Sequence, residues 1–246
     1  MLAFLPSFHV KSQRAAGETC DIDPLFLIDT PIAGILPTTS GSVEAAFQPD
    51  DGLLVSVVYG LRKNLNVGMS FGARRLLGSG KIIWNSLPGV MIRYRVFEES
   101  TVSPAFVIGF DTQGKDGYIP EDRQYAVKGP GIFTALSKNY TLLGSICFHG
   151  GINYSIERED GDWHPNIFAG LEKTVGPITS ILLEYNFAFD NDKKARGFWN
   201  GNLGIGCRVA TKIGFNIDFL LKNILESNPY FHGTVRQIKI QYVRYI

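Results

Sequence analysis

The sequence has no apolar run of the roughly 18 to 20 residues that a membrane-spanning helix requires, which excludes a helical membrane protein. It also has little net charge, because 24 Lys and Arg side chains oppose 23 Asp and Glu side chains and leave +1. Without a basic field, nucleic acid is not expected as a partner. The three cysteines, Cys20, Cys147 and Cys207, are too few and too widely spaced for a zinc site or a disulfide framework. We therefore expect no metal and no cofactor.

The chain is instead rich in residues of strands and turns, with 27 Gly, 12% aromatic residues and enough hydrophobic residues (45%) to fold. From about Ser40 onward, apolar and polar residues alternate with a period of two, which indicates β-strands. In residues 65–72, for example, one face carries Leu, Val, Met and Phe, whereas the other carries Asn, Gly and Ser. The alternation predicts twelve strands, at residues 40–48, 52–60, 65–72, 89–97, 102–111, 131–138, 140–155, 166–173, 178–189, 198–209, 212–222 and 234–246.

The connections between the predicted strands alternate in length. Tight turns are expected at residues 62–64, 98–100, 138–139, 174–176 and 210–211, and longer links at residues 73–88, 112–130, 156–165, 190–197 and 223–233. The link at residues 49–51 belongs to the long side but is brief. This alternation places all tight turns at one end of an up-and-down meander, as in outer-membrane barrels with short periplasmic turns.

The polar faces of the predicted strands carry mostly Gly, Ser, Asn and Ala with scattered charges, whereas the apolar faces are dense in Leu, Ile, Phe and Tyr. Small polar residues suit a narrow lumen. The twelve apolar faces together carry more bulky side chains than the core of a single-layer barrel needs, so they are expected to face outward. In hydrocarbon every strand must be paired, so the sheet is expected to close. Aromatic residues would form two interfacial girdles, with Tyr154, Phe187, Phe189 and Trp199 near the long links and Tyr94, Tyr140 and Tyr242 near the tight turns.

The expected fold is all-β: a closed, antiparallel, up-and-down transmembrane β-barrel of twelve strands, formed by residues 40–246 in the bacterial outer membrane. Residues 1–39 are expected to form an N-terminal segment that combines the remnant of a leader with a plug in the lumen or at the periplasmic mouth. Within it, we expect Asp29 to accept backbone N–H hydrogen bonds in a turn. A plain periplasmic leader is the alternative for this segment.

Residues 27–37 read Leu-Ile-Asp-Thr-Pro-Ile-Ala-Gly-Ile-Leu-Pro and contain the motif Asp29, Thr30, Pro31 and Gly34. This stretch resembles the N-terminal motif of a family of uncharacterised outer-membrane β-barrel proteins of double-membraned bacteria, the YjbH-like family. Further similar stretches are residues 77–80, 84–85, 88–90, 108–114, 137–140, 149–155 and 189–191, so the resemblance runs from about residue 27 to the end. It implies an outer-membrane barrel and supplies no catalytic residues. Such chains often end in Phe, whereas this sequence ends in Tyr-Ile.

Strand parity places nine polar side chains on the face that would line the lumen: Arg93, Arg95, His149, Asn153, Glu172, Glu184, Arg208, Asp218 and Lys239. Both signs of charge would share one narrow space. They would either line a thin aqueous path and set its selectivity, or neutralise one another as a plug of ion pairs. The sequence leaves both roles open.

No pattern of residues indicates catalysis, and we expect that the protein is not an enzyme. Ser145 and His149 share a face, but four residues along a strand separate them by roughly 13 Å, too far for a hydrogen bond. A serine from another strand would be needed, and no motif marks one. The acidic residues 157–162 lack the spacing of a Ca²⁺ loop, so a solvated loop is expected there.

The predicted function is that of a narrow channel, or of an envelope protein for export or passage, that takes small polar or glycan solutes. Its alternative is a sealed structural barrel, or one that binds at the cell surface through long extracellular loops. The expected partners are membrane lipid, the outer-membrane insertion machinery and such a solute. A soluble β-sandwich that acts as a binding protein is a third alternative.

Overall fold

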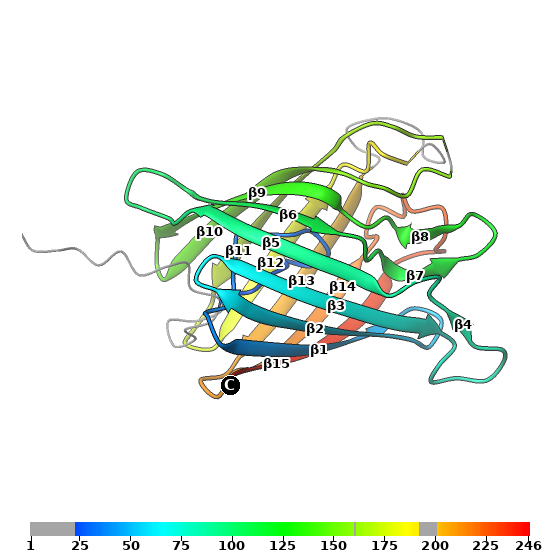
Figure 1. Ribbon diagram of the computed structural model, residues 1–246, viewed down its shortest axis with the longest axis horizontal. Coiled ribbons are helices and arrows are strands. Elements are labelled where there is room, and N and C mark those ends of the chain that lie inside the picture. Colours follow the sequence, from blue (N-terminus) through cyan, green and yellow to red (C-terminus); the bar gives the residue numbers. More distant parts are fainter. Residues whose placement is uncertain (1–22, 160, 192–200) are drawn as a thin grey trace, which may run out of the picture.

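Twelve strands form one closed ring in the computed structural model, which describes residues 23–159, 161–191 and 201–246. In order around the ring they are β1 (Ser40–Gln48), β2 (Gly52–Arg62), β3 (Leu65–Arg74), β5 (Gly89–Phe97), β6 (Ala105–Asp111), β9 (Gly131–Thr141), β10 (Ser145–Tyr154), β11 (Asn166–Thr174), β12 (Thr179–Asn186), β13 (Asn202–Ala210), β14 (Phe215–Lys222) and β15 (Val235–Tyr245). Every neighbouring pair is antiparallel, and the ring closes because β1 pairs with β15. The predicted closed, antiparallel, up-and-down barrel of twelve strands is confirmed, and a β-sandwich is excluded (Figure 1).

The two ends of the barrel differ in their connections. At the short-turn end, the strands are joined by residues 63–64, 98–104, 142–144, 175–178 and 211–214. At the long-loop end, they are joined by residues 49–51, 75–88, 112–130, 155–165, 187–201 and 223–234. Three short strands that the alternation did not predict lie within these long loops: β4 (Ile83–Trp84), and the hairpin of β7 (Lys115–Ile119) and β8 (Gln124–Val127). No helix in the described part of the chain is long and apolar enough to cross a membrane.

One turn lies further along the chain than predicted. Between β9 and β10 the chain turns at residues 142–144, not at residues 138–139. Leu143 and Gly144 have φ angles of 47° and 98°, a left-handed conformation that Gly adopts at little cost and that the alternation of side chains does not reveal. Smaller differences are that β6, β12 and β14 are shorter than the predicted strands 102–111, 178–189 and 212–222, and that residues 198–200 of the predicted strand 198–209 lie outside the described residues.

The outward face of the barrel is apolar all the way round. Every ring strand exposes a large hydrophobic side chain: Val43, Val57, Met69, Ile92, Ile108, Ile132, Phe148, Ile167, Ile181, Ile205, Phe219 and Ile238. Tyr94, Tyr140 and Tyr242, which are the aromatic residues predicted near the tight turns, are also exposed, whereas Trp199 lies outside the described residues. An apolar band that encircles the molecule is much larger than the patches that soluble monomers expose.

Candidate functional site in the barrel lumen

Residues 23–37, hereafter the plug, lie inside the barrel (Figure 1, dark blue). They form a hairpin in which Leu27 N donates to Thr30 O at 3.1 Å and Ile32 N donates to Leu25 O at 3.1 Å. Asp23 at the open end of the hairpin pairs with Arg95 near the short-turn end, and Asp29 at its tip pairs with Lys222 at the long-loop end, so both arms run along the barrel. The chain leaves the barrel at the short-turn end to begin β1. The tip of the plug points toward the long-loop end.

The tip of the plug is held by the carboxylate of Glu184 in β12. Glu184 accepts hydrogen bonds from the backbone N–H groups of Ile28, Asp29 and Thr30 at 2.8 to 3.1 Å, and from the Thr30 hydroxyl at 2.8 Å. One buried carboxylate thus satisfies the N–H groups of a turn that has no strand partner. The expectation that Asp29 accepts these bonds is wrong, because Glu184 accepts them and the Asp29 carboxylate pairs with Lys222 at 2.5 Å.

Two arginines of β5 hold the arms of the plug. Arg93 is 0% exposed and donates to the carbonyl oxygens of Leu25 at 2.9 Å and Gly34 at 3.1 Å. Arg95 pairs with Asp23 at 2.7 Å. The two arms also pack closely, since a Cβ on Gly34 would lie 1.7 Å from a backbone oxygen of the opposite arm. Buried guanidinium groups are costly unless they are hydrogen-bonded, so these contacts fix the plug in place.

Charges from β11, β13, β14 and β15 hold the other side of the plug. Arg208 donates to the carbonyl oxygen of Leu27 at 2.8 Å and makes two hydrogen bonds to Asp218, at 2.8 and 2.9 Å. Its remaining nitrogen lies 3.6 Å from Glu172. Lys239 donates to a backbone carbonyl oxygen at the tip of the plug. These four lumen charges are therefore engaged with one another or with the plug.

The two uncharged residues expected in the lumen, His149 and Asn153, lie in different surroundings. His149 Nδ1 shares a hydrogen bond of 2.8 Å with Ser137 Oγ of β9, which also accepts the N–H of Ala33 in the plug at 3.0 Å. A serine from another strand thus meets His149, but this serine is buried and engaged with the plug, so the pair anchors a backbone group. Asn153 instead donates to the carbonyl oxygen of Pro130, at the long-loop end.

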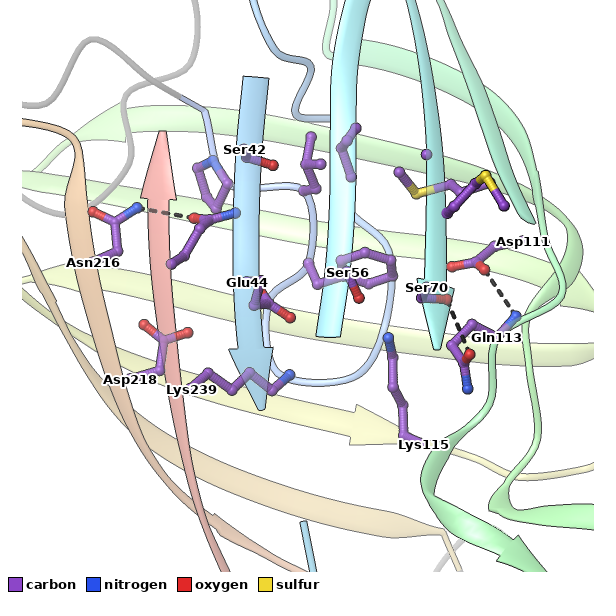
Figure 2. Close-up of a pocket in the computed structure, with 18 of the residues that line it drawn as sticks. Ser42, Glu44, Ser56, Ser70, Asp111, Gln113, Lys115, Asn216, Asp218 and Lys239 are labelled. Atoms are coloured by element: carbon purple, nitrogen blue, oxygen red, sulfur yellow. Dashed lines mark hydrogen bonds between the residues drawn. The ribbon is translucent and has the colours of Figure 1, made fainter. Parts of the chain in front are cut away.

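An open space, hereafter the lumen cavity, lies between the plug and the wall formed by β1, β2, β3, β14 and β15 (Figure 2). It contains about 650 Å³ of empty space, part of which is open to solvent. It extends from Ser42 and Asn216, in the short-turn half, to Gln113 and Lys115, beside the long-loop end. The cavity therefore follows the barrel axis alongside the plug.

Three charged residues of the lumen cavity, Glu44, Asp111 and Lys115, were not among the residues expected in the lumen. Glu44 falls on the polar face of β1, so strand parity was sufficient to find it. Lys115 lies within the link 112–130, where no periodicity indicates the direction of a side chain. Only the folding of β7 against the barrel brings it to the cavity.

The hairpin of β7 and β8 is fixed to the long-loop end by two acidic side chains. Asp116 of β7 pairs with Lys222 at 2.6 Å, and Lys222 also holds the tip of the plug. Glu157, in the loop after β10, accepts the backbone N–H groups of Tyr125 and Gly129, both at 2.7 Å. Burial raises the pKa of Glu157 to about 7, although the two N–H donors act in the opposite direction.

The acidic residues 157–162, considered above for Ca²⁺, do not converge. Glu157 faces the β8 hairpin, whereas Asp162 bonds the ring nitrogen of His164 at 2.6 Å. Within residues 23–159, 161–191 and 201–246, no three His, Cys, Asp or Glu side chains are grouped so that they would hold a metal ion.

No family model matches the chain, and no curated protein sequence does. Among solved structures, the chain is similar to Salmonella typhi OmpF in complex with daunomycin, with 8% identity and a TM-score of 0.30, over 83% of this chain and 96% of that chain. It is also similar to a barrel from the de novo design of transmembrane β-barrels, with 12% identity and a TM-score of 0.18, over 85% of this chain and 98% of that chain.

Proposed function

We propose that the protein is a β-barrel of the bacterial outer membrane in which small polar solutes pass along the lumen cavity. The apolar outward face supports the membrane location, because moving apolar surface out of water contributes roughly 25 cal/mol per Å². Ring closure supports it as well, since hydrocarbon offers no partner for an unpaired strand edge. Membership of the YjbH-like family and insertion by the outer-membrane machinery are part of this proposal.

The observation that carries the proposed passage is the lumen cavity itself. It follows the barrel axis between the plug and one wall, and both polar and apolar side chains line it. Charges of both signs, such as Glu44 and Lys115, face it. A narrow path of this kind favours small polar solutes over large ones or over ions of a single sign.

A second candidate is a sealed barrel that acts as a structural element or through its long loops. The contacts of the plug favour it, because Arg93 and Glu184 grip the plug from β5 and β12. The hairpin of β7 and β8 also covers part of the long-loop end. If the cavity is closed at one mouth, no solute crosses, and the exposed loops are left to bind a partner.

Single-channel conductance of the refolded protein in a planar lipid bilayer distinguishes the two candidates. The proposal requires a small, steady conductance in the wild-type protein. Arg93→Ala and Glu184→Ala should each raise it, because each removes an anchor of the plug. Lys63→Met is the matched control, since Lys63 forms an exposed ion pair with Glu98 at the short-turn end.

Insertion is measured separately, by flotation of the protein with lipid vesicles. A protein that inserts but does not conduct would establish the sealed barrel. A protein that stays monodisperse without detergent and does not float with the vesicles would refute the membrane location altogether.

A further inference from the structure

The ammonium group of Lys115 faces the lumen cavity and forms no ion pair within the described residues, although the Asp111 carboxylate acts on it electrostatically from across the cavity lining. Lys115 is the first residue of β7 and is only 6% exposed. Its Nζ lies 4.5 Å from the centre of the Phe26 ring in the plug, and within the described residues it makes no hydrogen bond or ion pair. Burial lowers the pKa of Lys115, so a carboxylate bound beside the ammonium group would stabilise its charged form. The position therefore favours an anionic group in the cavity.

The carboxylate of Glu44 enters the same cavity from β1 (Figure 2). Glu44 lies directly opposite Ser56 of β2 in the strand register. It acts electrostatically on Lys115 and Arg208, yet in the described part of the chain it forms no hydrogen bond or ion pair with either. A carboxylate in this state favours a cationic group beside it.

The other charges of the cavity are already engaged. Arg208 and Asp218 are bonded to each other, and Lys239 donates to the plug. Asp111 accepts the backbone N–H of Gln113 at 2.9 Å. Among the described residues that line the cavity, Glu44 and Lys115 are thus the charged pair that has no bonded partner.

Apolar side chains complete the lining of the cavity. Leu25, Val58 and Met91 form one buried cluster, and all three reach the cavity wall. A short methylene chain would contact them while its charged ends remain near polar groups. The space beside the plug limits such a solute to a small molecule.

We infer that the lumen cavity binds small zwitterionic solutes of amino-acid size, with the carboxylate of the solute at Lys115 and its ammonium group at Glu44. This inference deepens the proposed function and rests on it for the entry of solutes into the barrel. It names the class of solute that the passage would select.

The test compares probes of one chain length on the full-length protein in detergent micelles. Dissociation constants are measured by ligand-observed NMR for γ-aminobutyrate, butyrate, butylammonium and glucose. We expect γ-aminobutyrate to bind at least about fivefold more tightly than each of the others, because it alone satisfies both unpaired charges. Equal binding of the four probes, or tighter binding of glucose, would overturn the inference.

Variants of the two charged residues test whether the preference for γ-aminobutyrate arises in the lumen cavity. Lys115→Met and Glu44→Gln keep the shape of each side chain and remove one charge, and each should reduce the preference for γ-aminobutyrate to within about twofold. Lys63→Met, at the exposed pair with Glu98, should leave it unchanged. A preference that persists in both cavity variants would place the site elsewhere and overturn the inference.

The wild-type comparison needs no variant, so it decides the inference even if one of the substitutions prevents folding. The binding test and the conductance test can also fail independently of each other. A protein that binds γ-aminobutyrate selectively but does not conduct would refute the passage and keep the binding site. A protein that conducts but binds all probes equally would keep the passage and refute the zwitterion site.

Discussion

The two sides of the lumen use the same types of side chain in opposite ways. On the plug side, the charges are bonded to one another or to the backbone of residues 23–37, as Glu184 and Arg93 illustrate. On the cavity side, Glu44 and Lys115 face open space without bonded partners in the described residues. Burial alone does not separate the two sides, because Lys115 and Glu184 are both nearly inaccessible.

Whether a charge in a barrel lumen stabilises the fold or is available to a solute thus depends on the hydrogen-bonding groups that the plug presents to it. A buried charge that has a backbone partner stabilises the fold, and removing it leaves that partner unsatisfied. A charge that faces a cavity contributes little to the fold and is free to meet a solute.

The largest expected effect is on stability, from a matched pair of lysines. Lys222→Met should lower the free energy of unfolding by about 3–5 kcal/mol, because it leaves Asp29 and Asp116 buried side by side without their shared cation. Lys115→Met should change it by less than about 1 kcal/mol, since the described residues give Lys115 a cation–π contact and longer-range attraction to carboxylates but no hydrogen bond or ion pair. Urea unfolding in detergent micelles measures both. Equal costs would show that the two sides of the lumen do not differ.

The second prediction contrasts the outer and inner faces of β2. Val57→Arg should destabilise the protein in lipid vesicles by about 2–4 kcal/mol, because Val57 is 51% exposed on the outward face. Ser56→Arg, one residue earlier, should cost less than about 1 kcal/mol, since the new side chain enters the cavity opposite Glu44. The free energy of unfolding in vesicles measures both, and a reversed order would contradict the assignment of the outward face to lipid.

The third prediction uses the same two positions for conductance. Ser56→Trp should reduce single-channel conductance by about tenfold or more, because the indole fills the cavity beside the plug. Val57→Trp adds the same side chain to the outward face and should leave conductance unchanged. Planar-bilayer recordings measure both. A conductance that survives Ser56→Trp means that the path does not run through the lumen cavity.

The fourth prediction concerns the pH dependence of stability at the long-loop end. Because burial raises the pKa of Glu157 to about 7 from an ordinary value near 4.5, the folded state binds a proton more tightly than the unfolded state. The contribution of Glu157 protonation to the stability of the folded state is therefore complete below the ordinary pKa and is lost as pH rises to about 7. Amide hydrogen exchange of β8, corrected for the pH dependence of the intrinsic exchange rate, should show that local opening of β8 becomes easier as pH rises from about 4.5 to about 7. Glu157→Gln should remove the pH dependence, and a wild-type protein without it would contradict the shift.

Much of the fold followed from one property of the sequence. The period of two fixes which residues share a face of a strand, so parity was sufficient to identify twelve strands, and the structure places all nine of the residues expected in the lumen among its buried ones. The turn at Gly144 escaped this reasoning, because the alternation continues through Tyr140 and the turn depends on a left-handed backbone. The role of the nine residues in conduction stays a prediction.

The candidate site was less accessible from the sequence. Parity indicated that Glu184 faces inward, but not that it accepts the N–H of Ile28, which is 156 residues away in the chain. It gave no reason to place Lys115 in the lumen, because a loop has no period. These contacts depend on where the barrel closes and on which segment enters it.

The twelve ring strands, the face on which each of their residues lies and the order of long and short connections could thus largely be predicted, because these depend on local side-chain direction and turn residues. Only the tertiary structure decided that residues 23–37 occupy one side of the lumen and leave a cavity on the other. The physical reason is that pairing of buried charges depends on groups brought together across the closed ring, and local sequence carries no record of those distances.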